Sequence, residues 1–158
     1  MGLWNFLFGG GQGAPATPRR IAPDVYGFTP SGLPIYTKAS DFPDWRWPNF
    51  KPEEFDCKGT GRIALDPNAM DALQSLREEI GKPFVIVSGY RSPEHNAAVG
   101  GAKRSKHMEG IAFDVSMRGH DAEAFRAAAA RHGFNGIGSY STFTHIDTRS
   151  NRARWSGS

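Results

Sequence analysis

Proline is concentrated between residues 23 and 50, where five of the chain's eleven prolines lie. Because proline fixes its own φ angle and has no N–H to donate, it interrupts helices and central strands. The same stretch ends near Trp45 and Trp47, large side chains that favour packing over full exposure. We therefore expect residues 23–49 to be a Pro-rich linker that runs extended over a domain surface, and residues 50–158 to form the domain.

Residues 1–22 join a short aromatic head to a stretch rich in glycine, proline, alanine and threonine. This composition buries too little apolar surface to offset the entropy of ordering the chain, so we expect a flexible tail. The head, with Trp4, Phe6 and Phe8, is interpreted either as a peptide that docks into a larger assembly or touches a membrane surface, or as a disordered leader. No apolar run reaches the roughly 18 residues of a membrane-spanning helix, and the patch at 3–8 is shorter than the core of a signal peptide. We expect no transmembrane segment and no signal peptide.

The cysteine content argues against a disulfide-stabilised fold, and the charge pattern argues against a nucleic-acid-binding protein. Because Cys57 is the only cysteine, the chain can form no intramolecular disulfide, and this residue is expected to serve packing. The net charge is +3, and the basic residues fall in short runs, such as KRSK at 103–106, with few interleaved aromatic residues. Nucleic acid is therefore not an expected partner. The basic runs either form ordinary solvated surface or give the protein a mild preference for a polyanionic partner such as an anionic cell wall.

The spacing of apolar residues after residue 50 predicts a domain with both helices and strands. The pair Asp66-Pro67 has the form of a helix N-cap and first turn, and Gly81 ends the apolar spacing that follows. The run PFVIVS at 83–88 is too apolar to alternate, which is typical of a central strand buried on both faces. The expected elements are helices over 67–80, 93–99 and 121–132, strands over 83–88, 111–116 and 141–148, and a turn at Gly136 and Gly138.

Histidine and aspartate recur in and beside two of the predicted strands. The strand over 111–116 would bury Asp114, and a buried carboxylate needs a partner such as a cation. Downstream, His145 and Asp147 alternate with apolar residues and therefore point to the same side of their strand. Two histidines and one carboxylate are a common catalytic zinc set that leaves a fourth position open. We therefore predict that His107, Asp114 and His145 bind Zn²⁺.

Three further charged residues lie near these ligands in the sequence. Asp147 is a candidate general base, and its alternative role is to orient a ligand imidazole. Glu109 is a weaker candidate for the base, because a solvated loop acid explains it equally well. Arg91, just past the strand over 83–88, either holds a substrate carboxylate or a developing oxyanion, or forms a structural ion pair.

Residues 105–114 read SKHMEGIAFD, which has the form S-x-H-x-x-G-x-A-x-D. The segments SGYRS at 88–92, NAAVGG at 96–101 and HID at 145–147 accompany it. Together these segments resemble the zinc D-alanyl-D-alanine carboxypeptidases, within the superfamily that includes the hedgehog signalling domain. The resemblance extends over about residues 50–149. It implies an α+β fold with a small antiparallel sheet flanked by helices, one catalytic zinc ion, and cleavage of peptide bonds in bacterial peptidoglycan.

One position departs from the family pattern. Many relatives carry an acidic general base three residues before the last zinc-binding histidine, where this chain has Thr142, and a threonine cannot accept a proton as a carboxylate does. The chain resembles more closely the branch with H-x-D, found in phage and bacterial peptidoglycan peptidases, which makes Asp147 the predicted catalytic base. The motif also suggests substrate binding by Arg91 and Ser105.

These observations predict a zinc metallopeptidase that hydrolyses amide bonds in peptidoglycan stem peptides, as a carboxypeptidase or an endopeptidase. Because the substrate lies outside the cytoplasm and no signal peptide is expected, we expect delivery to the cell wall or periplasm in a phage particle, or release at lysis as an endolysin. The aromatic head of residues 1–22 favours delivery in the particle. The alternative is a catalytically weak or inactive wall-binding or virion structural module, which the departure at Thr142 would permit.

Overall fold

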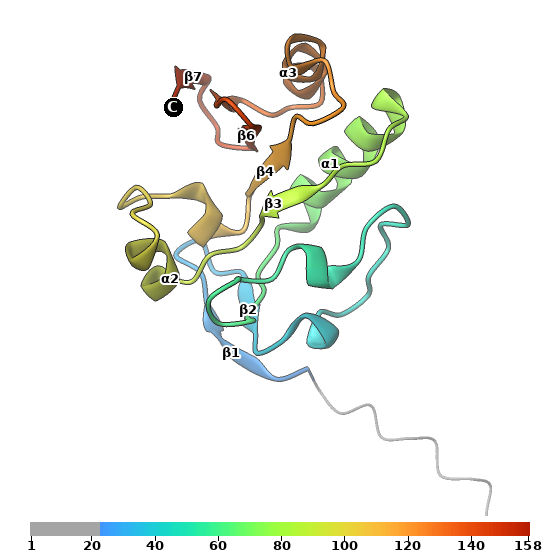
Figure 1. The fold of residues 1–158 in the computed structure, drawn as a ribbon. Coiled ribbons are helices and arrows are strands. Elements are labelled where there is room, and N and C mark those ends of the chain that lie inside the picture. Colours follow the sequence, from blue (N-terminus) through green and yellow to red (C-terminus); the bar gives the residue numbers. More distant parts are fainter. Residues whose placement is uncertain (1–22) are drawn as a thin grey trace, which may run out of the picture.

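A five-stranded sheet organises residues 23–158, the part of the chain described by a computed structural model (Figure 1). Its strands lie in the order β3-β4-β6-β5-β7, with bounds β3 Ile86–Ser88, β4 Ala112–Ser116, β5 Gly136–Ser139, β6 Phe143–Asp147 and β7 Ala153–Ser156. Neighbouring strands are antiparallel except β5 and β7, which are parallel. A separate antiparallel hairpin joins β1 (Val25–Phe28) to β2 (Pro34–Tyr36).

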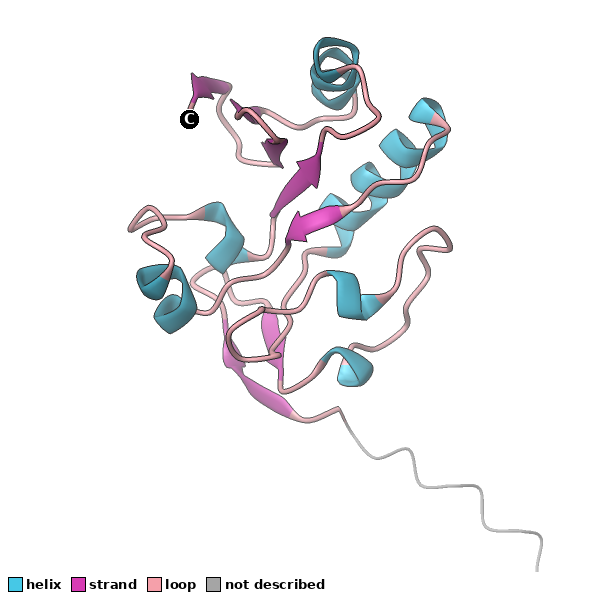
Figure 2. Cartoon of the chain, viewed as in Figure 1, coloured by secondary structure: helices cyan, strands magenta, loops and turns pink. Residues whose placement is uncertain are grey.

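Three α-helices and three short 3-10 helices complete these residues (Figure 2). They are α1 Pro67–Ile80, α2 Pro93–Ala98 and α3 Ala122–Arg131, with η1 Ala39–Asp41, η2 Pro52–Glu54 and η3 Lys106–Glu109. Among residues 23–158, no helix has both the length and the apolar character needed to cross a bilayer. The predicted α+β class, with a small and mainly antiparallel sheet, is confirmed.

The ends of the two longest helices follow from local sequence. At the start of α1, the Asp66 carboxylate accepts a hydrogen bond from the backbone N–H of Asn68, and at its end Gly81 adopts the left-handed conformation that glycine tolerates best. Similarly, the Asp121 carboxylate accepts from the N–H of Ala124 at the start of α3. The predicted helix over 67–80 is confirmed at both of its ends.

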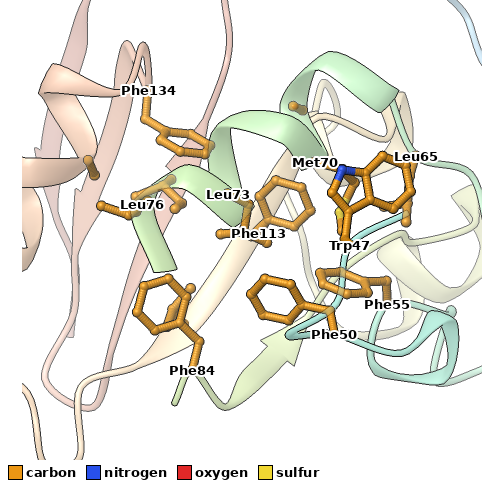
Figure 3. Close-up of a cluster of buried hydrophobic side chains, with 14 of the residues drawn as sticks. Trp47, Phe50, Phe55, Leu65, Met70, Leu73, Leu76, Phe84, Phe113 and Phe134 are labelled. Carbon is orange, nitrogen blue, oxygen red and sulfur yellow. The ribbon is translucent and has the colours of Figure 1, made fainter. Parts of the chain in front are cut away.

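The hydrophobic core lies between α1 and one face of the sheet, as Figure 3 shows. Apolar side chains of α1 spaced three residues apart pack with Phe113 and Val115 from β4. Phe55 is in edge contact with Phe113, with ring centroids 5.6 Å apart. Trp47, from the predicted linker, is buried in the same cluster and donates its indole N–H to the Asp71 carboxylate at 2.8 Å. The segment before residue 50 therefore contributes to the core.

The prediction that residues 83–88 form a central strand is wrong. The strand β3 lies at an edge of the sheet, where only β4 pairs with it among residues 23–158. Val85 and Val87 are 66% and 48% exposed. A run of β-branched residues reflects a preference for extended backbone, and this preference does not determine the position of a strand in the sheet.

The prediction of a turn at Gly136 and Gly138 is also wrong, because both glycines lie within β5. A Cβ atom at Gly138 would lie 2.5 Å from the indole ring of Trp155, so glycine is required here by the close approach of a side chain from β7. The strand β7 itself was not predicted, because it carries two polar residues and its partner is β5, a non-local neighbour.

Two remaining predictions concern Cys57 and the chain before residue 23. Cys57 is buried with Ile35, Ala64 and Tyr90, which confirms its expected packing role. The predicted tail or docking peptide lies outside the described residues 23–158. The division into a linker over 23–49 and a domain from residue 50 stays a prediction.

Candidate metal centre

The three predicted metal ligands come from three elements and meet over one face of the sheet. Asp114 on β4 is paired directly with His145 on β6, so both side chains leave the same face, opposite the core side chain of Phe113. His107 approaches from η3. Its Nε2 lies 3.1 Å from Asp114 Oδ1 and 3.2 Å from His145 Nδ1, and these last two atoms are 2.9 Å apart.

The three ligand atoms form a nearly equilateral triangle of a size that suits zinc. An ion held tetrahedrally at about 2.0–2.2 Å separates its ligand atoms by roughly 3.3–3.5 Å. The separations of 2.9 to 3.2 Å therefore require only a small outward shift to admit the ion. All three residues are buried, and two imidazole nitrogens with one carboxylate oxygen are a donor set that zinc prefers. The residues present fit a zinc ion.

The second ring nitrogen of each histidine is held by a hydrogen-bond acceptor. His107 donates from Nδ1 to the carbonyl oxygen of Gly89 at 2.7 Å, and His145 donates from Nε2 to Asp147 Oδ2 at 2.7 Å. These contacts select the tautomer in which the other nitrogen presents its lone pair to a metal. The orientation of both imidazoles is therefore set by groups that do not bind the metal.

The electrostatics of the three ligands favour a positive charge between them. Burial lowers the pKa of His107 below its usual range. Burial alone would raise the pKa of Asp114, but its close contacts with the imidazoles of His107 and His145 outweigh it and hold this pKa well below its usual range. Burial would lower the pKa of His145, but its contacts with Asp114 and Asp147 outweigh this and raise it. The deprotonated Asp114 carboxylate thus attracts a cation, and a bound metal ion satisfies it.

Arg91 and Ser105, which the sequence assigns to substrate binding, lie beside the candidate ligands, and both contact them. Arg91 donates from Nη2 to Asp114 Oδ2 at 3.1 Å and from Nε to Ser88 Oγ at 3.0 Å. The Asp114 carboxylate therefore has one oxygen toward the histidines and the other toward the guanidinium. Ser105 caps η3, because its Oγ accepts from the backbone N–H of His107 at 3.3 Å. Both residues position ligands, and their predicted contact with substrate stays a prediction.

The ligands open into a cleft of about 640 Å³ whose lining is basic. The basic residues that line it are Arg91, Arg104, Lys106 and Arg149. Within residues 23–158, Asp114 is the one acidic residue on this lining. Arg104 is exposed and forms no ion pair with another described residue, so its charge is available to a ligand in the cleft. The cleft favours an anionic substrate.

The cleft is also lined by three aromatic side chains that the sequence does not predict, and we call them the aromatic wall. Tyr140 stacks on Phe143 with ring centroids 4.5 Å apart, and its hydroxyl accepts a hydrogen bond from the indole N–H of Trp155 at 3.0 Å. All three side chains line the cleft. None belongs to a motif, and Trp155 reaches the site only because β7 pairs with β5. A sequence signal for this wall would have required knowledge of that pairing.

The chain matches a model of a family described as Peptidase M15 over residues 48–147, well over half of its length. It belongs to the M15 family. A curated relative, the zinc D-Ala-D-Ala carboxypeptidase of Streptomyces albus G, is 41% identical over 66 residues. This match covers 41% of the chain and 26% of the relative, so the two share about a quarter of the relative's length. The predicted resemblance is confirmed at the level of the family.

In this member of the M15 family, Asp147 occupies the position of a residue that orients a ligand. Its side chain is 0% exposed and lies against His145 Nε2, on the far side of the imidazole from the ligand atom Nδ1. Arg149 donates to both carboxylate oxygens, at 2.8 and 2.7 Å. Burial would raise the pKa of Asp147, but hydrogen bonds from Arg149 and His145 outweigh it and lower this pKa, which makes the carboxylate a weak base. Of the two roles considered for Asp147, the geometry supports orientation.

Glu109, the other acidic candidate for the general base, does not face the cleft either. Glu109 pairs with Lys106 at 2.9 Å and does not line the cleft. Thr142, at the position where many relatives carry an acid, is exposed. Among residues 23–158, the M15 site therefore presents no second carboxylate to a substrate in the cleft.

Substitution of Gly136 tests how tightly the backbone of β5 packs against the Asp147–Arg149 ion pair. A Cβ atom at this position would lie 2.2 Å from Asp147 Oδ1 and 2.5 Å from Arg149 Nε. We expect Gly136→Ala to push this ion pair aside and to lower the free energy of unfolding by about 1–3 kcal/mol in chemical denaturation. Gly27→Ala is the matched control, because nothing lies within 4 Å of the added Cβ, and it should change stability by less than about 0.5 kcal/mol. Equal stability of the two variants would contradict this packing.

Proposed function

We propose that this chain is a zinc peptidase that hydrolyses amide bonds in the stem peptides of bacterial peptidoglycan. The observation that carries the proposal is the buried triangle of two histidines and one aspartate, each oriented by a further hydrogen bond, at the base of a basic cleft. Membership of the M15 family supports the reaction class. The relative from Streptomyces albus G supports the substrate class and the identity of the metal through its name.

Each residue of the site has a distinct role in the proposed amide hydrolysis. His107, Asp114 and His145 would hold the ion from the floor of the cleft. Bound zinc supplies a Lewis acid that polarises a carbonyl and lowers the pKa of water toward about 7. Arg91 lines the cleft beside Asp114, where its guanidinium holds an oxygen of the substrate as negative charge develops. Ser105 keeps His107 in place by capping η3.

The charges that line the cleft suit a peptide substrate that carries carboxylate groups. Arg104 and Lys106 line the cleft together with the aromatic wall. Guanidinium and ammonium groups bind carboxylates through charge-assisted hydrogen bonds. Stem peptides bear such groups at their C-terminus and along the chain, so the cleft suits either a carboxypeptidase or an endopeptidase.

A second candidate function is a wall-binding module with weak or no catalysis. One observation favours it: within residues 23–158 no carboxylate other than the ligand Asp114 lines the cleft, and Asp147 lies behind His145. Such a module would keep the basic cleft and the metal for shape and would bind peptidoglycan without cutting it.

Mass spectrometry of fragments released from purified peptidoglycan tests the proposal. We expect zinc-loaded protein to release stem-peptide fragments, a chelator to stop the release, and added zinc to restore it. The fragment masses identify the bond and so distinguish a carboxypeptidase from an endopeptidase. Intact binding to the sacculus without any released fragment would contradict the catalytic proposal and support the wall-binding module.

We also propose that the protein acts at the cell wall or in the periplasm, delivered by a phage particle or released at lysis. This proposal rests on the sequence of residues 1–22, with the aromatic head at Trp4, Phe6 and Phe8, and these residues lie outside the described part of the chain. Association of the full chain with purified phage particles, compared with a chain that starts at residue 23, tests it. Equal association of the two chains would contradict docking through the head.

A further inference from the structure

A second cavity, of about 450 Å³, is lined by residues of α3, of β5 and of the edge strand β7 with the residue before it. Figure 1 shows α3 and β7 at the same end of the molecule, away from the β1–β2 hairpin. Small side chains on α3, Ala127 and Ala130, form part of its lining, together with the hydroxyl-bearing residues Ser139 and Ser156. Its volume lies within the range of about 300–1,000 Å³ that is typical of ligand pockets.

Three arginines line this cavity, and no acidic residue lines it. They are Arg126 on α3, Arg152 just before β7 and Arg154 within β7, and we call the cavity the arginine pocket. Neither Arg126 nor Arg152 forms an ion pair with any other residue between 23 and 158. By contrast, Arg131, one turn further along α3, pairs with Glu79 at 2.9 Å. The arginine pocket therefore concentrates positive charge that the described chain does not neutralise.

Arg154 is held in place by the backbone. It donates from Nη1 to the carbonyl oxygens of Asn135 and Ala153, so its guanidinium is fixed without using a carboxylate. Burial and the neighbouring charge of Arg152 both lower the pKa of Arg154, as expected where like charges meet without an acid between them. A guanidinium that is already positioned loses less conformational entropy when it binds a ligand.

The chemistry of this lining selects an oxyanion. Guanidinium groups bind phosphate and carboxylate through paired, charge-assisted hydrogen bonds, and serine hydroxyls can donate to the remaining oxygens. Trp155 lines both the arginine pocket and the catalytic cleft, so the two cavities are neighbours on either side of one side chain. A polymer that enters the cleft can therefore reach the arginine pocket with an adjoining group.

We propose that the arginine pocket binds an oxyanion, phosphate or carboxylate, of the same cell-wall polymer whose stem peptide enters the catalytic cleft. This inference rests on the proposed function, and it adds a second anchoring point outside the cleft. The pocket would hold the polymer beside the metal centre and raise the affinity for intact walls over that for short soluble peptides.

Co-sedimentation of the zinc-loaded full chain with purified walls tests this proposal. The test variant is Arg126→Gln with Arg152→Gln, which leaves the backbone contacts of Arg154 intact. The matched control is Arg77→Gln with Arg118→Gln, which removes the same charge from surfaces outside the two basic cavities. We expect the test variant to bind intact walls at least about fivefold more weakly than the wild type, and the control to bind within about twofold. A loss of equal size in both variants, or no loss in either, overturns the proposal.

Two further arms identify the source of the oxyanion. Walls treated with hydrofluoric acid lose their phosphodiesters but keep their peptides and carboxylates. If the difference between wild type and test variant disappears on treated walls, the oxyanion is phosphate, and if it persists, the oxyanion is a carboxylate of peptidoglycan. Short duplex DNA and soluble wall fragments are compared as competitors of wall binding at equal concentrations of negative charge. Equally strong competition by the DNA would overturn the assignment to a wall polymer. Because co-sedimentation measures bound protein and mass spectrometry measures released fragments, a failure of catalysis appears only as missing fragments and is distinguishable from a failure of this inference.

Discussion

Replacing His107 by alanine will abolish amide hydrolysis by this protein, with an expected fall in the rate of fragment release of at least about a thousandfold. The residue is 2% exposed, and its Nε2 supplies one corner of the ligand triangle. Without it, only two of the three candidate ligands remain, on Asp114 and His145. A thousandfold fall corresponds to about 4 kcal/mol of lost transition-state stabilisation, which is reasonable for the loss of a Lewis acid.

Metal content and thermal stability are the measurements that accompany the rate. Zinc should raise the melting temperature of the wild type and leave that of His107→Ala unchanged, because only the wild type binds the ion in its folded state. His132→Ala is the matched control, since this histidine lies near Glu79, on the surface and away from the cleft. His107→Ala protein that keeps both a stoichiometric metal ion and turnover would contradict the assignment of the ligands.

Replacing Asp147 by asparagine will weaken zinc binding by about 10- to 100-fold, because a neutral amide orients the His145 imidazole less strongly than a carboxylate does. The hydrogen bond from His145 Nε2 to Asp147 Oδ2, at 2.7 Å, is the contact that changes. We expect most of the catalytic rate to return when zinc is raised above its new dissociation constant. A residue that acts as the general base would give the opposite pattern: unchanged zinc affinity and a rate that stays low at saturating zinc.

The control for this experiment is another aspartate that pairs with an arginine. Asp71 pairs with Arg46 at 2.9 Å, and both side chains are about half exposed. Asp71→Asn should therefore leave zinc affinity unchanged and reduce stability by less than about 1 kcal/mol. Isothermal titration with zinc, together with rates measured across a range of zinc concentrations, separates the two roles of Asp147.

Two of the three candidate ligands, Asp114 and His145, could be placed on one face from the sequence because strand periodicity is a local property. Alternation along 111–116 and 141–148 places Asp114 and His145 on the faces opposite their apolar neighbours, and this requires no knowledge of which strands pair. The helix over 67–80 could be predicted for the same reason, since Asp66 and Gly81 act on their own backbone. The role of Asp147 depends on its hydrogen bond with His145, which the sequence does not show. The sequence therefore leaves open whether Asp147 is the general base or orients the imidazole, and the geometry favours orientation.

The features that were missed depend on contacts between distant segments. The edge position of β3 is set by the pairing of β4 with β6, which the composition of residues 83–88 does not encode. Gly136 and Gly138 look like turn residues, yet they lie in a strand that Asp147 and Trp155 approach closely. The aromatic wall of the cleft is assembled from β5, β6 and β7 only after these strands pair. Sequence periodicity reports the faces of each element and carries little information about its neighbours.

The strand β4 carries core residues on one face and a candidate metal ligand on the other. Phe113 and Val115 are in the core, and Asp114 between them is in the ligand triangle. A single inserted or deleted residue within this strand would exchange the two faces, placing an acid in the core and a phenylalanine at the metal. Among homologous chains, length changes should therefore accumulate in the loops and be absent from β4, even where its apolar residues vary freely among themselves.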